Sequence, residues 1–173
     1  MNRRQLLVGG GAVAVGTAAI GAGSVIGMGS LGSAKEAAAA FRSALPVSPQ
    51  DRDLVRYATL AANGHNTQPW RFQLSAREVR ILPDFTRRTT VVDPDDHHLF
   101  VSLGCAAENL ALAAAAAGRG GELETRPDGT IVFARGTSKA RERELAEAIP
   151  HRQSTRSDYD GRPLTNSDLR SLE

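Results

Sequence analysis

The chain has 173 residues, the size of one folded domain with a short additional segment, and its 41% hydrophobic and 23% charged residues are ordinary for a globular protein. The formal net charge is only +2, and since no basic stripe interleaved with aromatic residues accompanies it, the sequence indicates no nucleic-acid partner. A single cysteine, Cys105, excludes an intramolecular disulfide framework and a cysteine-cluster metal site.

Residues 1–34 have the features of a targeting segment, and they are left out of the fold prediction. Arg3 and Arg4 stand in the twin-arginine arrangement, and an uncharged run rich in glycine and alanine follows from residue 6 to Ala34. That run is long enough to span a bilayer, since about 20 residues suffice. We therefore expect export by the twin-arginine route to a periplasmic or extracytoplasmic location. Both cleavage near Ala34 and retention as an anchor on the outer face of the cytoplasmic membrane stay open.

Residues 35–45 are rich in alanine and predict a weak helix. A second helix is predicted to begin with Ser48 as its N-cap and Pro49 in the first position. Apolar residues then recur at helical spacing and form one face: Leu54, Ala58 and Ala61. The pair Asn63–Gly64 supplies the stop, so this helix leads directly into the segment 66–70.

Two β-hairpins follow from alternating side chains. Residues 71–74 and 79–82 alternate at period two, and residues 122–125 and 130–134 form a second pair. Each pair is joined by residues typical of turns.

Two more helices complete the prediction. A long helix is expected between the hairpins, from Asp93 as its N-cap to Gly118. A charged helix is expected over residues 139–148, with Ser138 as its N-cap. Helices packed on a small, mainly antiparallel sheet make an α+β fold.

Two local clusters invite a ligand role, and both have simpler interpretations. Arg87 and Arg88 are adjacent in a connecting loop, where a solvated surface pair is favoured over a ligand role. Asp93 and His97 are four positions apart on one helix face, but His97 and His98 point about 100° apart and cannot easily share one ion. With no third ligand at a suitable spacing, we expect no metal site.

The segment 63–70, N-G-H-N-T-Q-P-W, joins the second helix to the first hairpin. Asn66 and Gln68 carry amides that each offer a donor and an acceptor, Pro69 fixes the backbone, and Trp70 is the only tryptophan. Such a loop suits a flat, polar-edged aromatic ligand better than a metal or a nucleophile. A solvent-exposed turn followed by a core tryptophan is the alternative, and the spacing alone leaves both open.

A second constellation, R-x-S-x-R, consists of Arg152, Ser154 and Arg156. Two guanidiniums that flank a hydroxyl can bracket a phosphate with charge-assisted, partly bidentate hydrogen bonds. Taken alone the pattern is common, and a surface loop is then the better interpretation.

Residues 61–72, A-A-N-G-H-N-T-Q-P-W-R-F, resemble the flavin-binding loop of the nitroreductase-like FMN-binding oxidoreductases. Three further stretches agree with that superfamily in the expected order: 82–88, 93–110 and 151–156. The resemblance is strongest to the two-halved Acg-like branch, whose chains often begin with a twin-arginine signal. It covers nearly everything from residue 48 onward.

The resemblance implies an α+β nitroreductase-like fold with FMN as the cofactor, and transfer of two electrons from reduced flavin to a small nitroaromatic or quinone-like acceptor. The residues it implies at the flavin and its phosphate are His65, Asn66, Gln68, Pro69, Trp70, Arg152, Ser154 and Arg156. In the named branch position 154 is often a threonine. No motif indicates a site for an NAD(P)H donor, and no residue stands out as a catalytic acid, base or nucleophile.

The same resemblance divides the sequence into a twin-arginine signal segment at 1–34, a first nitroreductase-like half at 35–148 and the start of a second half at 149–173. The first half supplies the flavin loop and the second begins with the phosphate-binding residues, so both halves of a pseudo-dimer would build one flavin site. Because the sequence stops in what resembles the first helix of the second half, we expect a truncated chain. Its incomplete fold would need a second half or a homodimer partner.

Two other functions stay open. One is a non-catalytic protein that binds or stores flavin, and anaerobic reduction of bound flavin by NADPH would separate it from an oxidoreductase. The other is an inert remnant, which a colourless protein with no response to added FMN would support.

Overall fold

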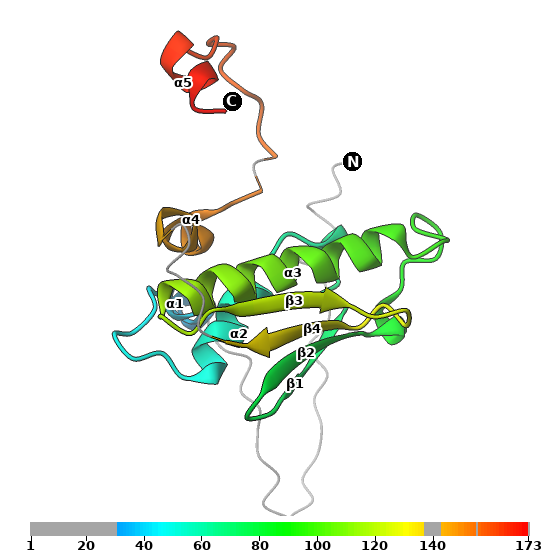
Figure 1. Ribbon diagram of the computed structural model, residues 1–173. Coiled ribbons are helices and arrows are strands. Elements are labelled where there is room, and N and C mark those ends of the chain that lie inside the picture. The colour runs from blue at the N-terminus through cyan, green and yellow to red at the C-terminus, as the bar shows by residue number, and fades with distance from the viewer. Residues whose placement is uncertain (1–30, 137–142, 155, 173) are drawn as a thin grey trace, which may run out of the picture.

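The computed structural model describes residues 31–136, 143–154 and 156–172, with side chains from residue 35 onward. In that part of the chain, helices pack on a small antiparallel sheet, so the predicted α+β fold is confirmed (Figure 1). The α-helices are α1 (Leu31–Phe41), α2 (Asp51–Thr59), α3 (His97–Ala116), α4 (Arg143–Ala148) and α5 (Asn166–Arg170). Short 3-10 helices are η2 (Gly64–Asn66), η3 (Phe85–Arg87) and η4 (Ile149–His151). The strands are β1 (Trp70–Leu74), β2 (Glu78–Pro83), β3 (Gly121–Thr125) and β4 (Ile131–Arg135), in the sheet order β1-β2-β4-β3.

Both predicted β-hairpins form, and they join edge to edge through β2 and β4. Antiparallel pairing places Phe72 opposite Ile81 in the first hairpin and Leu123 opposite Phe133 in the second. Ile81 also lies opposite Ile131, which fixes the register between the two hairpins. Because side chains alternate along a strand, these apolar residues share the sheet face along which α3 runs (Figure 1).

Helix α3 supplies the centre of the hydrophobic core. Leu103, Ala106 and Leu110 on α3 are fully buried in one cluster with Ile81 and Phe133 of the sheet. Its many alanines leave room for α2 to pack closely on a second side. By length and composition α3 could cross a membrane, but half of its apolar window is buried inside this fold, as expected of a core helix.

Helix α2 begins later than predicted. The sequence analysis placed Ser48 at its N-cap and Pro49 in the first position, and both assignments are wrong. Gln50 is the N-cap, and the carboxylate of Asp53 accepts the backbone N–H of Gln50 at 2.8 Å. A carboxylate three residues after the cap satisfies the helix start as well as a serine cap would, so the helix begins at Asp51.

Helix α3 also begins later than the predicted cap at Asp93. Asp96 has a left-handed backbone, with φ of 59°, and this turn delays the helix to His97. Asp93 nevertheless caps α3 from upstream, because its buried carboxylate accepts the N–H of His98 at 2.9 Å and that of Leu99 at 3.0 Å. The predicted N-cap and helix start were therefore wrong, since Asp96 is the N-cap, although the Asp93 side chain does bond to the first turn of α3.

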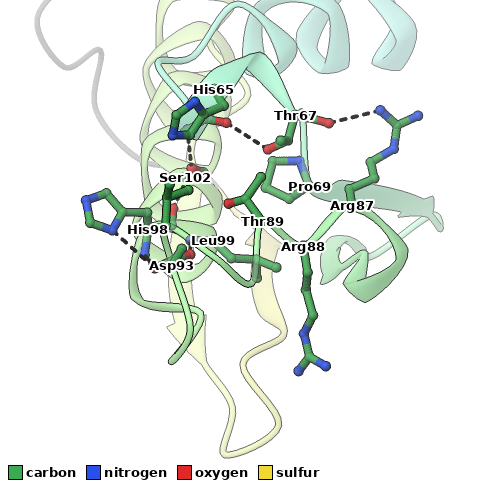
Figure 2. A pocket seen from close by; sticks show the side chains of 12 residues that line it. His65, Thr67, Pro69, Arg87, Arg88, Thr89, Asp93, His98, Leu99 and Ser102 are labelled. Atoms are coloured by element: carbon green, nitrogen blue, oxygen red, sulfur yellow. Dashed lines mark hydrogen bonds and ion pairs between the residues drawn. The ribbon is translucent and has the colours of Figure 1, made fainter.

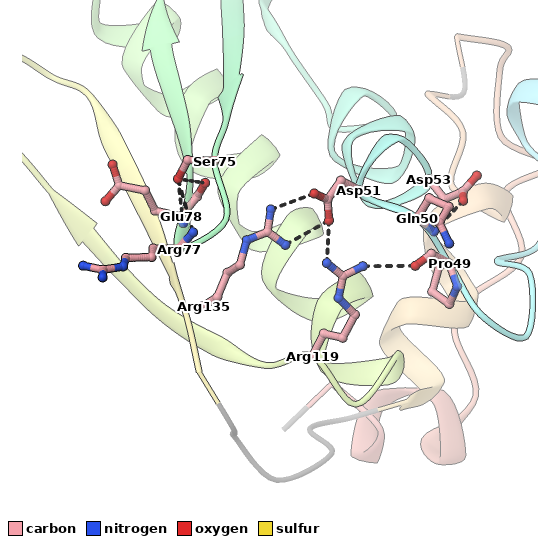
Figure 3. A network of polar contacts seen from close by, with 9 residues as sticks. All are labelled: Pro49, Gln50, Asp51, Asp53, Ser75, Arg77, Glu78, Arg119 and Arg135. Carbon is pink, nitrogen blue, oxygen red and sulfur yellow. Dashed lines mark hydrogen bonds and ion pairs between the residues drawn. The ribbon is translucent and has the colours of Figure 1, made fainter.

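An ion-pair network fastens the first turn of α2 to the sheet (Figure 3). Asp51 accepts two hydrogen bonds from Arg135, each 2.9 Å long, and a third from Arg119. Arg119 also donates to the carbonyl of Pro49 at 3.0 Å. The hydrogen bond from Arg135 lowers the pKa of Asp51 below its ordinary value, against the effect of partial burial. With its N-terminus fixed in this way, α2 presents its other end to the segment 60–68.

The C-terminal part of the described chain leaves the sheet. Helix α4 lies inside the predicted charged helix, whose proposed cap, Ser138, falls outside the described residues. After η4 the segment 156–172 runs away from the sheet, as Figure 1 shows. Tyr159 is 86% exposed and Leu172 is 76% exposed, so apolar side chains of this segment face solvent.

Candidate functional site

Two segments distant in sequence meet at a cavity of about 340 Å³ at the C-terminal end of α2. We call it the arginine cavity. Its polar lining comes from the residue after α1, the end of α2, the loop that contains η2 and the segment after η4: Arg42, Thr59, Asn63, Asn66, Gln68, Arg152, Ser154 and Arg156. Five of the eight residues that the sequence singled out are among them.

The other three lie elsewhere. His65 and Pro69 line a second cavity, of about 150 Å³, which we call the histidine cavity. Trp70 is only 7% exposed and packs in the core at the start of β1. Of the two interpretations that the spacing left open for Trp70, the structure has the core tryptophan.

The loop from Asn63 to Pro69 forms the wall between the two cavities. Asn66 and Gln68 line the arginine cavity, while His65 and Thr67 line the histidine cavity (Figure 2). Three of its residues have left-handed backbones, with φ of 51° at His65, 57° at Asn66 and 49° at Gln68. Such conformations are unfavourable for residues other than glycine and are concentrated at functional sites.

Hydrogen bonds hold this loop in its left-handed conformation. The side-chain oxygen of Asn63 accepts the N–H of Gln68 at 2.9 Å, and the hydroxyl of Thr67 donates to the carbonyl of Gly64 at 2.9 Å. Helix α3 contributes Ser102, whose hydroxyl oxygen accepts the N–H of Gly64 at 3.2 Å. The amides of Asn66 and Gln68 are thus presented to the cavity by a loop that is fixed at both ends.

Arg87 and Arg88 belong to the support of this site. Arg87 donates to the carbonyl of Thr67 at 2.9 Å and so holds the loop from the outside. Arg88 makes two hydrogen bonds to Asp96, of 3.0 and 2.6 Å, and lies 4.4 Å from the ring centre of Phe85. Both guanidiniums point away from the histidine cavity in Figure 2 and bond to protein groups. The solvated surface pair expected from the sequence is thus only part of their role.

The segment after η4 is tied to the end of α2. Arg152 donates to the carbonyl of Leu60 at 3.0 Å, which crosses 92 residues of sequence. Arg42 donates to the carbonyls of Pro150 at 2.9 Å and Arg152 at 2.8 Å. These contacts bring the R-x-S-x-R residues beside the Asn66 and Gln68 amides.

The arginine cavity concentrates positive charge. Several guanidiniums elsewhere in the fold pair with carboxylates, as Arg135 does with Asp51. Among the described residues, no carboxylate lies within ion-pair distance of Arg42, Arg152 or Arg156, and none lines the cavity. Three such cations around one cavity suit an anionic ligand, because their charges are otherwise balanced only by solvent ions.

The histidine cavity contains an aspartate–histidine contact. Nδ1 of His98 lies 3.2 Å from Asp93, so Asp93 faces His98, and the Asp93–His97 face considered in the sequence does not form (Figure 2). Burial alone would raise the pKa of Asp93, but the hydrogen bonds from His98 and Leu99 outweigh it and lower that pKa. In the described part of the chain, no group of three or more metal-ligating side chains comes together.

Sequence reasoning missed Arg42 and gave Asn63 only a helix-stopping role. Arg42 stands in an alanine-rich segment without a motif, and only the folded chain brings it to residues 150 and 152. Asn63 is part of the quoted loop, and its side chain turned out to brace Gln68. An asparagine five residues before a left-handed residue is a weak signal for such a brace.

No protein-family model matches the chain. Over 140 residues it is 29% identical to "Putative NAD(P)H nitroreductase MT3217" of Mycobacterium tuberculosis strain CDC 1551, and equally to "Putative NAD(P)H nitroreductase Rv3131" of strain H37Rv. The match covers 76% of this chain but 40% of each relative, so the chain spans about two-fifths of the length of these curated proteins. The similarity supports the nitroreductase-like superfamily that the motifs resemble, and the α+β fold is consistent with it.

Proposed function

We propose that this chain binds FMN in the arginine cavity and forms part of an exported oxidoreductase of nitroreductase type, in the two-halved Acg-like branch. The observation that carries the proposal is the meeting of the segments 63–68 and 152–156 at one cavity. From the sequence, the first segment was assigned to the flavin and the second to its phosphate, which are different ends of the same ligand. The names of the two mycobacterial relatives support the reaction type.

The side chains of the cavity fit both ends of FMN. Arg152 and Arg156 offer guanidinium N–H groups to a phosphate, and the hydroxyl of Ser154 lies between them in sequence. The amides of Asn66 and Gln68 offer both donors and acceptors, as the polar edge of a flavin ring requires. When bound, FMN would supply two-electron chemistry, with a nitroaromatic or quinone-like acceptor and NAD(P)H as the donor.

The chain's own residues would bind and orient the cofactor. The braced loop fixes the two amides before a ligand arrives, so little conformational entropy is lost on binding. Arg87 and Ser102 support that loop from outside the cavity and would act through it. Because their contacts are with the loop backbone, they are positioning residues.

We further propose that a second half of the protein, or a second copy of the chain, packs against the segment 156–172. Its exposed apolar side chains are the supporting observation, since such residues usually mark an interaction surface. Export by the twin-arginine route is proposed from the sequence of residues 1–34, of which residues 1–30 lie outside the described residues.

A flavin titration tests the proposal. Arg152→Ala should weaken FMN binding by roughly ten- to a hundred-fold, because a charge-assisted contact contributes about 1.5–3 kcal/mol. Arg126→Ala is the matched control, since Arg126 is exposed in the turn between β3 and β4. Fluorescence of added FMN gives the affinities. Equal affinity of the parent chain and Arg152→Ala would show that the arginine cavity is not the phosphate site.

Flavin binding without catalysis is a second candidate function. The polar lining consists of guanidinium, amide and hydroxyl groups, which bind ligands well but are poor general acids and bases at neutral pH. Anaerobic addition of NADPH to the flavin-loaded chain separates the two. Bleaching of the flavin absorbance supports an oxidoreductase, and an unchanged spectrum supports storage or transport.

A further inference from the structure

Arg42 contributes a third guanidinium to the arginine cavity, from outside both segments singled out by sequence. Its Nη1 atom donates to the carbonyls of Pro150 and Arg152, at 2.9 and 2.8 Å. A guanidinium carries five N–H donors, and these two bonds involve only one of its three nitrogens. The donors on Nε and Nη2 have no hydrogen-bond partner among the described residues.

The other two guanidiniums of the cavity are also incompletely used. Arg152 directs Nη2 to the carbonyl of Leu60 at 3.0 Å, while Nη1 has only a 3.5 Å contact with Ser154. Arg156 makes no hydrogen bond or ion pair within the described part of the chain. Like charges that share one cavity repel each other, and a bound dianion would remove that repulsion.

We propose that Arg42 is a further phosphate-binding residue, and that it makes the cavity selective for the phosphorylated flavin over neutral riboflavin. This inference rests on the proposed flavin function, and it adds a residue and a source of specificity. A phosphate monoester carries a charge of about −1.5 to −2 at neutral pH, which three guanidiniums can balance and riboflavin does not supply.

The position of Arg42 also couples ligand binding to the segment 150–152. Its Nη1 atom holds two carbonyls of that segment, and its Nε and Nη2 donors have no hydrogen-bond partner among the described residues. A phosphate that bonds to Arg42 would therefore reinforce the contact that holds Arg152 in place. Loss of Arg42 would remove one direct contact with the ligand and would also loosen the contact made by Arg152.

The test compares FMN with riboflavin in titrations of the parent chain, Arg42→Gln, Arg42→Lys and the control Arg126→Gln. Arg42→Gln should weaken FMN binding about ten-fold or more and change riboflavin binding less than about two-fold. Arg42→Lys should recover part of the loss, because it keeps the charge but not the planar fork. Higher salt should reduce the difference in FMN affinity between the parent chain and Arg42→Gln, because salt screens the charge of the guanidinium.

Equal losses for FMN and riboflavin would overturn the inference, because a purely structural arginine would affect both ligands alike. Unchanged FMN binding by Arg42→Gln would overturn it as well. If the parent chain binds no flavin, the flavin proposal fails, and inorganic phosphate becomes the probe. A phosphate-dependent rise in the unfolding temperature of the parent and Arg126→Gln that is smaller in Arg42→Gln would still support an anion-binding Arg42. An equal rise in all three would overturn it.

Discussion

At the scale of single residues, the loop between the two cavities holds the least favourable backbone in the described chain. His65, Asn66 and Gln68 are left-handed although none is glycine, and each such conformation costs on the order of 1–2 kcal/mol. The hydrogen bond from the N–H of Gln68 to Asn63 offsets part of that cost. In return, alternate side chains of one short loop serve opposite cavities.

Replacement of Gln68 separates backbone strain from ligand contact. Gln68→Gly and Gln68→Ala both remove the side-chain amide, so both should lower FMN affinity by a similar factor. The glycine variant should be more stable by about 1 kcal/mol, since glycine adopts a positive φ without a Cβ clash. Urea unfolding measures the free energies and flavin titration the affinities. Equal stabilities of the two variants would show that the left-handed backbone at this position is not strained.

At the scale of elements, the sequence correctly predicted the features that local residue patterns control. Both hairpins were located correctly because alternation at period two is visible within ten residues, and their turns carry turn residues. The starts of α2 and α3 were wrong because a helix can be capped in several ways. The start of α2 depends on the hydrogen bond to Asp53, and the start of α3 on the left-handed backbone of Asp96. Which of the possible caps is used depends on the surrounding fold.

The attachment of α2 to the sheet should depend on pH through Asp51. Its hydrogen bond from Arg135 lowers its pKa in the folded chain, so its contribution to stability is complete above about pH 4 and is lost as the pH falls through the lowered pKa. The carboxylate is 37% exposed, so solvent screening limits the expected cost of Asp51→Asn to about 1 kcal/mol.

The measurement is the unfolding free energy of parent and Asp51→Asn between pH 3 and pH 7. The difference between the two should be constant near neutral pH and should shrink below about pH 4. Asp95→Asn serves as a control in an exposed turn. A difference that stays constant down to pH 3 would mean that Asp51 has no lowered pKa in the folded chain.

At the scale of the whole molecule, the arginine cavity could be predicted only in part. The segments 63–70 and 152–156 carry recognisable residue patterns, and their meeting was expected from family resemblance. Arg42 was not foreseeable, because its contacts lie 108 and 110 residues away and leave no periodic pattern in the sequence. Likewise, the sequence predicted a surface role for Arg87, and its hydrogen bond to the carbonyl of Thr67 is visible only in the folded chain.

The exposed segment 156–172 should make the chain self-associate where no other partner is present. Its apolar side chains are Tyr159, Leu164, Leu169 and Leu172. Light scattering during size-exclusion chromatography should give a mass above that of the monomer at tens of micromolar chain. Tyr159→Ser with Leu169→Ser should lower that mass, whereas Val47→Ser, which changes an exposed side chain outside this segment, should not. A monomeric parent would remove this support for a partner on the segment.

The two bonds from Arg42 also set an order of events during protein synthesis. Their acceptors are made 108 and 110 residues after the donor, and at 5–20 residues per second this interval is roughly 5–20 s. Helix α2 and both hairpins can emerge from the ribosome and fold within that interval, while the binding cavity still lacks one wall. A nascent chain would therefore already have its scaffold when residue 152 emerges, and capture of the cofactor would follow the folding of that scaffold.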